Sequence, residues 1–279
     1  MTFASDLVAE LERATAGTTV PRVRALHLPP PEAAASKNGE FCALELDDGA
    51  LGIAYVLLED VITRLSAAGD LGGVAGVDAL QLAREFVGGA TDLRRTLGFA
   101  AANALSRSVM DRNGFAPPRA TDSIGGIAPQ AGDHIGMVGL FSPLLKQVTA
   151  AGAQLTVVEL NPDYAGQYDG YRVTLDAAEL ECCNKVLSTS TILLNHSVDR
   201  MLAHCRNATR IALIGPSAGC LPDPLFARGV DVVGGSWVSD RAGFVDALRS
   251  GAAWSAFAYK FALTPADWAG AGRLWLADS

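Results

Sequence analysis

Small polar residues and glycines follow five apolar runs in the second half of the chain, and this placement predicts a binding site. The runs begin HIGMV, QLTVV, KVLS, RIALI and VDVV. Hydroxyl groups and the backbone N–H groups at helix starts suit an oxyanion or another polar ligand group. Ordinary caps and turns use the same residue types, so the set carries the prediction more than any one residue. The candidates are Gly139, Phe141, Ser142, Glu159, Asn161, Thr189, Ser190, Thr191, Asn195, Gly215, Pro216, Ser217, Gly234 and Gly235.

Glu159 is the acidic residue of this set. It lies about twenty residues beyond the first turn, where a dinucleotide-binding fold places the carboxylate that bonds to a ribose. The turn reads GMVGLFSP, however, and Phe141 and Pro143 stand where glycines would let the backbone approach a pyrophosphate. NAD is therefore not expected as a cofactor. No P-loop, G-x-S-x-G elbow or H-E-x-x-H motif occurs either.

Alternating strands and helices in the second half would bring the candidates together. This β-α-β succession predicts a parallel, doubly wound sheet, in which ligands bind at the carboxyl ends of the strands. Ser142 is expected to be an N-cap, because Pro143 suits the first position of a helix. The expected helices cover 142–152, 175–183, 192–205 and 240–251.

The first half shows strands before helices, which is typical of an α+β domain. A Pro-, Gly- and Ala-rich connector, 113–133, separates the two patterns. We expect a domain boundary there, with an α+β domain over 1–124, a Rossmann-like α/β domain over 125–279, and few core contacts between them. The elements expected in the first domain are a helix over 5–16, antiparallel strands over 22–28, 41–46 and 52–58, and helices over 77–88 and 91–113.

Composition limits the functional classes. The formal net charge is −8 and no cluster of basic residues occurs, so no nucleic-acid partner is expected. The N-terminus lacks the pattern of a secretory signal, and no apolar run is long enough to span a membrane. Five cysteines at low density favour reduced thiols. We expect a cytoplasmic protein without membrane contacts, and a homodimer as the commonest oligomer.

Three segments resemble those of a known family: LGFAAANAL (97–105), TSTILLNHS (189–197) and IGPSAGCLPDPLFARGVDVVGGSWVSD (214–240). On these the chain resembles the heavy-metal-chelation proteins, in which an enolase-N-terminal-like domain precedes a Rossmann-like domain. The resemblance implies that α/β fold, a site between the domains, and a link to metals or metal-binding small molecules. It also implies that Asn103, an amide that is costly to bury without partners, faces this site. Tyr55 is a weaker candidate of the same kind.

Two departures from the family's pattern introduce metal-binding side chains. His196 stands where the pattern T-G-T-T-L-x-N-G-T has its second glycine, and Cys220 follows a changed G-P-S-T-P segment. Imidazole and thiolate are ligands of Zn, Cu and Ni. If these two side chains converge, Glu159 is the expected third ligand. Alternatively, Cys220 packs as a small buried hydrophobe and His196 caps a helix.

Two functions are the main alternatives on these residues, and a purely structural partner of a larger complex is a third. The first is a metal-handling protein that binds a metal, or a small metal-chelating ligand, in a cleft between its domains. The second is an enzyme that acts on a small anionic metabolite, with Glu159 or His196 as the acid or base. The first needs ligands that converge, and the second needs a titratable group within hydrogen-bond reach of a substrate proton.

Overall fold

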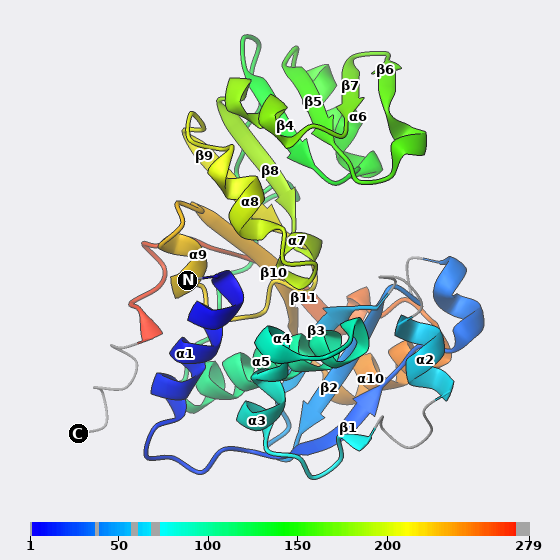
Figure 1. Cartoon of the computed structure of the whole chain (residues 1–279), viewed down its shortest axis with the longest axis vertical. Helices are drawn as coiled ribbons and strands as arrows, with labels where there is room; N and C mark the ends of the chain where they lie inside the picture. The colour runs from blue at the N-terminus through cyan, green and yellow to red at the C-terminus, as the bar shows by residue number, and fades with distance from the viewer. Residues whose placement is uncertain (1, 37–38, 57–60, 68–72, 272–279) are drawn as a thin grey trace.

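The chain folds around two β-sheets, one small and antiparallel and one large and mostly parallel (Figure 1). The computed structural model describes residues 2–36, 39–56, 61–67 and 73–271. This is the α/β architecture expected from the two sequence patterns. Among the described residues, no helix is both long and apolar enough to cross a membrane.

The small sheet is built from the first half of the chain, in the order β1-β2-β3 with antiparallel pairing throughout. Thr91 caps the longest helix, as expected, by accepting the backbone N–H of Arg94. The strands are β1 (Val23–His27), β2 (Phe41–Leu46) and β3 (Leu51–Tyr55). The helices are α1 (Phe3–Thr15), α2 (Val61–Ala67), α3 (Ala79–Ala83), α4 (Glu85–Gly88) and α5 (Asp92–Arg112).

The alanine-rich centre of α5 allows β3 to pack against the helix backbone. A Cβ atom on Gly52 would lie 2.1 Å from the carbonyl oxygen of Ala100 and 2.2 Å from the nitrogen of Ala104. Such a close approach requires glycine on the strand and small residues on the helix. The AAANAL segment is therefore a packing surface, and α5 is buried along most of its length.

The large sheet has the strand order β11-β10-β9-β8-β4-β5-β7-β6. The six inner strands run parallel, while β11 and β6 pair antiparallel at the two edges. Strands β6, β7 and β11 were not predicted, because they are short or lack a regular pattern and their pairing is decided by their neighbours. The strands are β4 (His134–Val138), β5 (Gln154–Val158), β6 (Gly166–Tyr168), β7 (Tyr171–Thr174), β8 (Lys185–Thr189), β9 (Arg210–Ile214), β10 (Val232–Val238) and β11 (Ala258–Leu263).

Three helix predictions in this half need correction. Ser142 is the first residue of α6 and not its N-cap; Phe141 holds the cap position and makes no side-chain capping bond. The segment 175–183 forms a 3₁₀ helix over Ala177–Cys182. The helix expected over 192–205 is broken into α7 and α8 by residues 195–197. The helices are α6 (Ser142–Ala150), α7 (Thr191–Leu194), α8 (Val198–Ala203), α9 (Asp223–Phe226) and α10 (Arg241–Ser250).

The two halves share their hydrophobic core, so the expectation of few core contacts between them is wrong. The largest buried cluster joins residues of α1, α3 and α5 to residues of β8, β9, β10 and the 218–225 segment. A second cluster packs Phe244 and Leu248 of α10 against Phe41 and Ile53 of the small sheet. That sheet is thus covered by α5 on one face and by α10 on the other, which explains why every residue of β2 is buried.

The connector 113–133 contains no continuous helix, as expected, and it runs beside the edge strand β11. The backbone N–H of Ala120 donates to the carbonyl of Lys260 at 2.9 Å, and that of Ala262 donates to the carbonyl of Pro118 at 3.3 Å. The connector is therefore fixed to the large sheet by backbone pairing.

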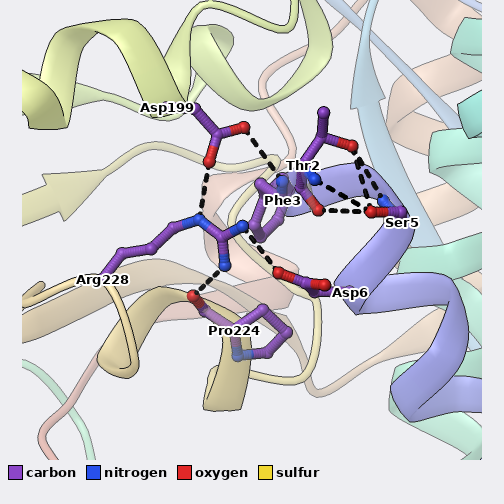
Figure 2. Close-up of polar contacts among 7 residues, drawn as sticks. All are labelled: Thr2, Phe3, Ser5, Asp6, Asp199, Pro224 and Arg228. Atoms are coloured by element: carbon purple, nitrogen blue, oxygen red, sulfur yellow. Dashed lines mark hydrogen bonds and ion pairs between the residues drawn. The ribbon is translucent and has the colours of Figure 1, made fainter.

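An arginine ties α1 to the large-sheet half, as Figure 2 shows. Arg228 donates to Asp199 and to Asp6, both at 2.7 Å, and to the carbonyl of Pro224 at 2.8 Å. Asp199 also accepts the backbone N–H of Phe3 at 2.9 Å. The side chain of Arg228 is 16% exposed, so these charge-assisted hydrogen bonds are largely shielded from solvent.

Candidate functional site

The expected binding residues gather where the order of the parallel strands reverses. The chain passes from β4 to β5 on one side and later returns to β8 on the other, so the switch point lies between β4 and β8. Ligands of open α/β sheets bind at the carboxyl ends of the strands beside such a point. A pocket of about 440 Å³ lies there, and we call it the switch-point pocket. The predicted residues that line it are Gly139, Phe141, Glu159, Thr189, Ser190, Thr191, Asn195, Gly215 and Pro216.

The N-terminal half supplies one wall of this pocket through Glu40, Phe41 and Tyr55. Tyr55 ends β3 and is partly buried. Burial raises the pKa of its phenol above the ordinary value, and the nearby carboxylates of Glu40 and Glu159 raise it further. These two carboxylates come from opposite halves of the chain, so the pocket is an acidic site between the two halves.

Glu159 follows the last residue of β5 and holds the neighbouring loop. Its carboxylate accepts the backbone N–H of Leu140 at 3.0 Å and that of Leu160 at 2.7 Å. A carboxylate has about four acceptor positions, so positions remain for a ligand. Glu159 therefore shapes the loop after β4 and also presents negative charge to the pocket.

Hydroxyl groups line the side formed by β8 and β9. The hydroxyls of Thr189 and Thr191 lie 3.1 Å apart, and the Thr189 hydroxyl also accepts the backbone N–H of Thr191 at 3.3 Å. A Cβ atom on Gly215 would lie 2.2 Å from the hydroxyl oxygen of Ser190, and Gly215 has a φ of +148°. Only glycine allows the loop after β9 to cross Ser190 so closely, and this crossing joins the two loops into one wall.

Four of the other predicted residues do not line the switch-point pocket. Ser142 is exposed at the start of α6 and does not line the switch-point pocket, and Gly235 lines a neighbouring pocket. Ser217 is buried, and its carbonyl accepts the side-chain N–H of Asn103 at 2.9 Å. Asn103 also donates to the carbonyl of Ile53 at 2.8 Å. Asn103 thus joins α5, β3 and the loop after β9. It fixes this loop, whose residues Gly215 and Pro216 line the pocket, without lining the pocket itself.

His196 and Cys220 do not form the expected metal site. His196 lies in a separate surface pocket with Arg95 and Asp199, and its ring stacks on Phe86 with centroids 4.9 Å apart. Cys220 is 2% exposed within the shared core, where burial raises the pKa of its thiol to about 12. In the described part of the chain, no group of three or more His, Cys, Asp and Glu side chains is arranged to hold a metal ion.

The physical reason is that loops after adjacent strands can point to different sides. His196 has a φ of +57°, which turns the chain away between α7 and α8. Burial lowers the pKa of His196, and the nearby Arg95 lowers it further. Cys220 belongs to the loop that packs against α5, where Leu221 donates its backbone N–H to the hydroxyl of Ser106 at 3.0 Å. Each side chain therefore follows the packing of its own loop.

Sequence reasoning did not find Glu40 and Ser197, which also line the switch-point pocket. Glu40 precedes β2 at the end of a Pro- and Ala-rich loop, where no periodic pattern identifies a pocket residue. Ser197 donates from its hydroxyl to the side-chain oxygen of Asn195 at 2.6 Å, within the turn between α7 and α8. Spacing from a strand end could have included Ser197, but nothing local marks Glu40.

Comparison with known proteins identifies the family. A family model described as "Putative heavy-metal chelation" (DUF364) matches residues 127–266, and a second with the same description (DUF4213) matches residues 39–106. No curated protein matches the chain. Solved structures of two DUF364 proteins of unknown function share the fold. The one from Pyrococcus horikoshii is 17% identical with a TM-score of 0.70, and the match covers 94% of this chain and 99% of that chain.

The second solved structure, from Desulfitobacterium hafniense, is also 17% identical and has a TM-score of 0.67. Its match covers 93% of this chain and 98% of that chain. At this identity the two structures show a common fold over nearly the whole length. The DUF364 model alone spans half of the sequence, and the second model covers much of the N-terminal half. The chain therefore belongs to the DUF364 family, described as putative heavy-metal chelation.

Proposed function

We propose that this protein handles a metal as a complex with a small organic chelator, and that the complex binds in the switch-point pocket. The observation that carries the proposal is the pocket of about 440 Å³ between the two halves, with carboxylates on both walls. Its volume lies in the range typical of small-molecule sites, about 300–1,000 Å³. A bare ion held by side chains would need ligands that converge within about 2.0–2.6 Å of one point.

The charge of the pocket favours a cationic complex. The described residues that line it include two carboxylates and no basic side chain. Phenol, hydroxyl and carboxylate oxygens can accept hydrogen bonds from amine or water ligands on a metal such as Cu²⁺, Ni²⁺ or Zn²⁺. The family description, heavy-metal chelation, agrees in kind with such a ligand.

The alternative, an enzyme acting on a small anionic metabolite, has less support. Glu159 would repel an anion, and its carboxylate already accepts two strong backbone hydrogen bonds. His196 lines a different pocket and is not available as an acid or base for this one. The lining therefore favours binding of a cationic complex over acid–base chemistry on an anion.

Isothermal titration with small copper complexes tests the proposal. The bis(ethylenediamine) complex of Cu²⁺ is cationic, whereas the EDTA complex is anionic and of comparable size. We expect the cationic complex to bind with one-to-one stoichiometry and the anionic complex not to bind. Glu159→Gln should weaken the cationic complex by about tenfold, equivalent to about 1.4 kcal/mol, because it removes one charge from the wall.

Two further variants complete the test. Tyr55→Phe should weaken binding by a smaller factor, because it removes one hydroxyl and no formal charge. Glu12→Gln is the matched control, since Glu12 forms an exposed ion pair with Arg84 on another surface and should leave binding unchanged. Equal affinity of the two copper complexes, or equal loss in Glu12→Gln and Glu159→Gln, would refute the proposed function.

A further inference from the structure

A second pocket, of about 290 Å³, adjoins the switch-point pocket. The connector, the loop after β4 and the strands β9, β10 and β11 enclose it, and we call it the connector pocket. Phe141, Gly215 and Pro216 line both pockets, so the two share one wall. No function discussed so far uses this second space.

The connector pocket is apolar and suits a flat ring. Its walls include Phe141, Leu144, Ile214, Pro216 and Phe261. Gly234 leaves part of one wall without a projecting side chain, and at Gly235 the ring of Phe261 takes the place of a side chain, since a Cβ atom there would lie 2.6 Å from it. Aromatic and proline rings around such a space favour an aromatic guest, which can stack or meet them edge to face.

The connector pocket has one basic and one acidic side chain, whereas the charged side chains that line the switch-point pocket are both acidic. Lys260 is the only basic side chain among its described lining residues, and it makes no hydrogen bond or ion pair with the rest of the described chain. Asp122 also lies there, but its carboxylate accepts the backbone N–H groups of Ile124 and Gly126 within its own turn. An exposed ammonium group therefore stands free beside an apolar space, next to an acidic pocket.

We propose that the connector pocket is a second subsite, which binds a planar aromatic group carrying a negative charge, and that this group belongs to the same chelator whose metal end lies in the switch-point pocket. The second part of this inference rests on the proposed function. The ligand class is thus a dipolar aromatic chelate, with a cationic metal end and an anionic substituent on the ring. The first part, the subsite itself, does not rest on the proposed function, because it is inferred only from the apolar walls and from Lys260.

The fluorescent probe 8-anilinonaphthalene-1-sulfonate matches the aromatic, anionic class, and N-phenyl-1-naphthylamine is its neutral counterpart. We expect the sulfonate probe to bind the native full-length chain with one-to-one stoichiometry. Ser123→Trp should block both probes, since Ser123 is an exposed lining residue of the pocket and an indole ring there would occupy the space that a probe needs. Lys260→Met should weaken the sulfonate probe by roughly threefold to fivefold at low salt and leave the neutral probe unchanged.

Lys146→Met is the matched control, because Lys146 is exposed on α6 and lines neither pocket. Thermal midpoints of all variants should equal that of the wild type, which shows that each remains folded. Undiminished binding of the sulfonate probe to Ser123→Trp would overturn the subsite. Equal effects of Lys260→Met and Lys146→Met would overturn its preference for an anion.

The one-to-one complex of Cu²⁺ with 8-hydroxyquinoline-5-sulfonate tests whether one ligand uses both pockets. It is a flat chelate with a metal at one end and a sulfonate at the other. We expect Ser123→Trp and Glu159→Gln each to weaken it, whereas the naphthalene sulfonate should respond to Ser123→Trp alone. Loss of chelate binding in Glu159→Gln but not in Ser123→Trp would refute the shared ligand and leave the proposed function intact. The reverse pattern would refute the proposed function and leave the subsite intact.

Discussion

His196 occupies a backbone position that suits glycine. Its φ of +57° lies in the left-handed region, where a Cβ atom is strained. Stacking of the imidazole on Phe86 compensates for part of this strain. The family pattern has glycine at this place, and the structure supplies the reason: the chain must turn between α7 and α8. The residue type at 196 therefore reflects backbone geometry and contact with Phe86.

Comparing His196→Gly with His196→Ala separates these two effects. Both variants lose the ring, but only alanine keeps the Cβ atom in the left-handed region. We expect the glycine variant to be more stable than the alanine variant by about 1 kcal/mol, measured by urea denaturation. Titration with Zn²⁺ should give the same result in both variants and in the wild type. Equal stability of the two variants would show that position 196 relaxes out of this conformation.

Asn103 is a second residue whose role follows from its contacts, here the hydrogen bonds of its buried side-chain amide. Its amide nitrogen donates to the carbonyls of Ile53 and Ser217, while the residue is 2% exposed. Its side-chain oxygen has no hydrogen-bond partner among the described residues. The amide is therefore used as a double donor that fixes the loop after β9 to the N-terminal half.

Asn103→Asp should be strongly destabilising, because a carboxylate of the same shape would face two carbonyl oxygens. We expect a loss of about 3 kcal/mol or more in the free energy of unfolding. The control is Asn113→Asp at the partly buried end of α5, which should cost much less. Chemical denaturation monitored by circular dichroism gives both values. A loss below that of the control would mean that the two hydrogen bonds contribute little.

At the scale of elements, α1 is held to the large-sheet half through Arg228. Burial raises the pKa of Asp199, but hydrogen bonds from the Phe3 N–H and from Arg228 outweigh it, so the pKa lies below its ordinary value of 3.8. A carboxylate with a lowered pKa contributes stability above the unfolded-state pKa, and this contribution is lost as the pH falls through the folded-state pKa. The attachment of α1 should therefore weaken in acid.

Arg228→Gln should lower the free energy of unfolding by about 2 kcal/mol at neutral pH, since hydrogen bonds to charged groups are lost. The difference from the wild type should shrink as the pH falls below 3.8, the ordinary value for Asp199, because the carboxylates of both proteins become protonated. Arg13→Gln is the control, because Arg13 is 67% exposed in its pair with Glu10. A difference that stays constant down to low pH would exclude the ionic origin.

At the scale of the whole molecule, the two halves share a core, and we expect them to unfold as one unit. The small sheet buries one face against α5 and the other against α10, and α10 follows β10 of the large sheet in the chain. Separation at residue 124 would expose the face that Phe244 and Leu248 cover. We therefore expect that neither half is stable when separated from the other.

Phe244→Ala should destabilise the entire chain by about 3 kcal/mol, since Phe244 is fully buried between the halves. All four tryptophans follow residue 236, and Trp237 and Trp254 contact Arg107 and Phe41 of the first half. Fluorescence therefore reports on the second half and on its contacts with the first, while far-UV circular dichroism reports on the secondary structure of both. We expect the two signals to change in one coincident transition in the wild type and in the variant. Two separated transitions would contradict a single cooperative unit.

Local patterns in the sequence determined the parallel sheet and the edge at which the candidate residues lie. The apolar runs before Thr189 and Gly215 each specify a buried strand, and parallel strands bring their carboxyl ends to the same edge. Glu159 could be placed there for the same reason. Thr91 was identifiable as an N-cap because capping depends on residues within one turn. These features need only contacts between residues close in sequence, or a regular succession of elements.

Only the tertiary structure decided which side chains meet across that edge. Glu40 and Tyr55 join the pocket through the packing of the small sheet, which no local pattern encodes. Cys220 is a core residue because its loop packs on α5. His196 lies outside the switch-point pocket because its own left-handed backbone conformation turns the chain between α7 and α8. Whether a Cys or His side chain can bind a metal or instead packs in the core is decided by contacts between segments far apart in the chain. These contacts depend on how the two sheets share a core. The spacing of residues along the chain does not specify that packing.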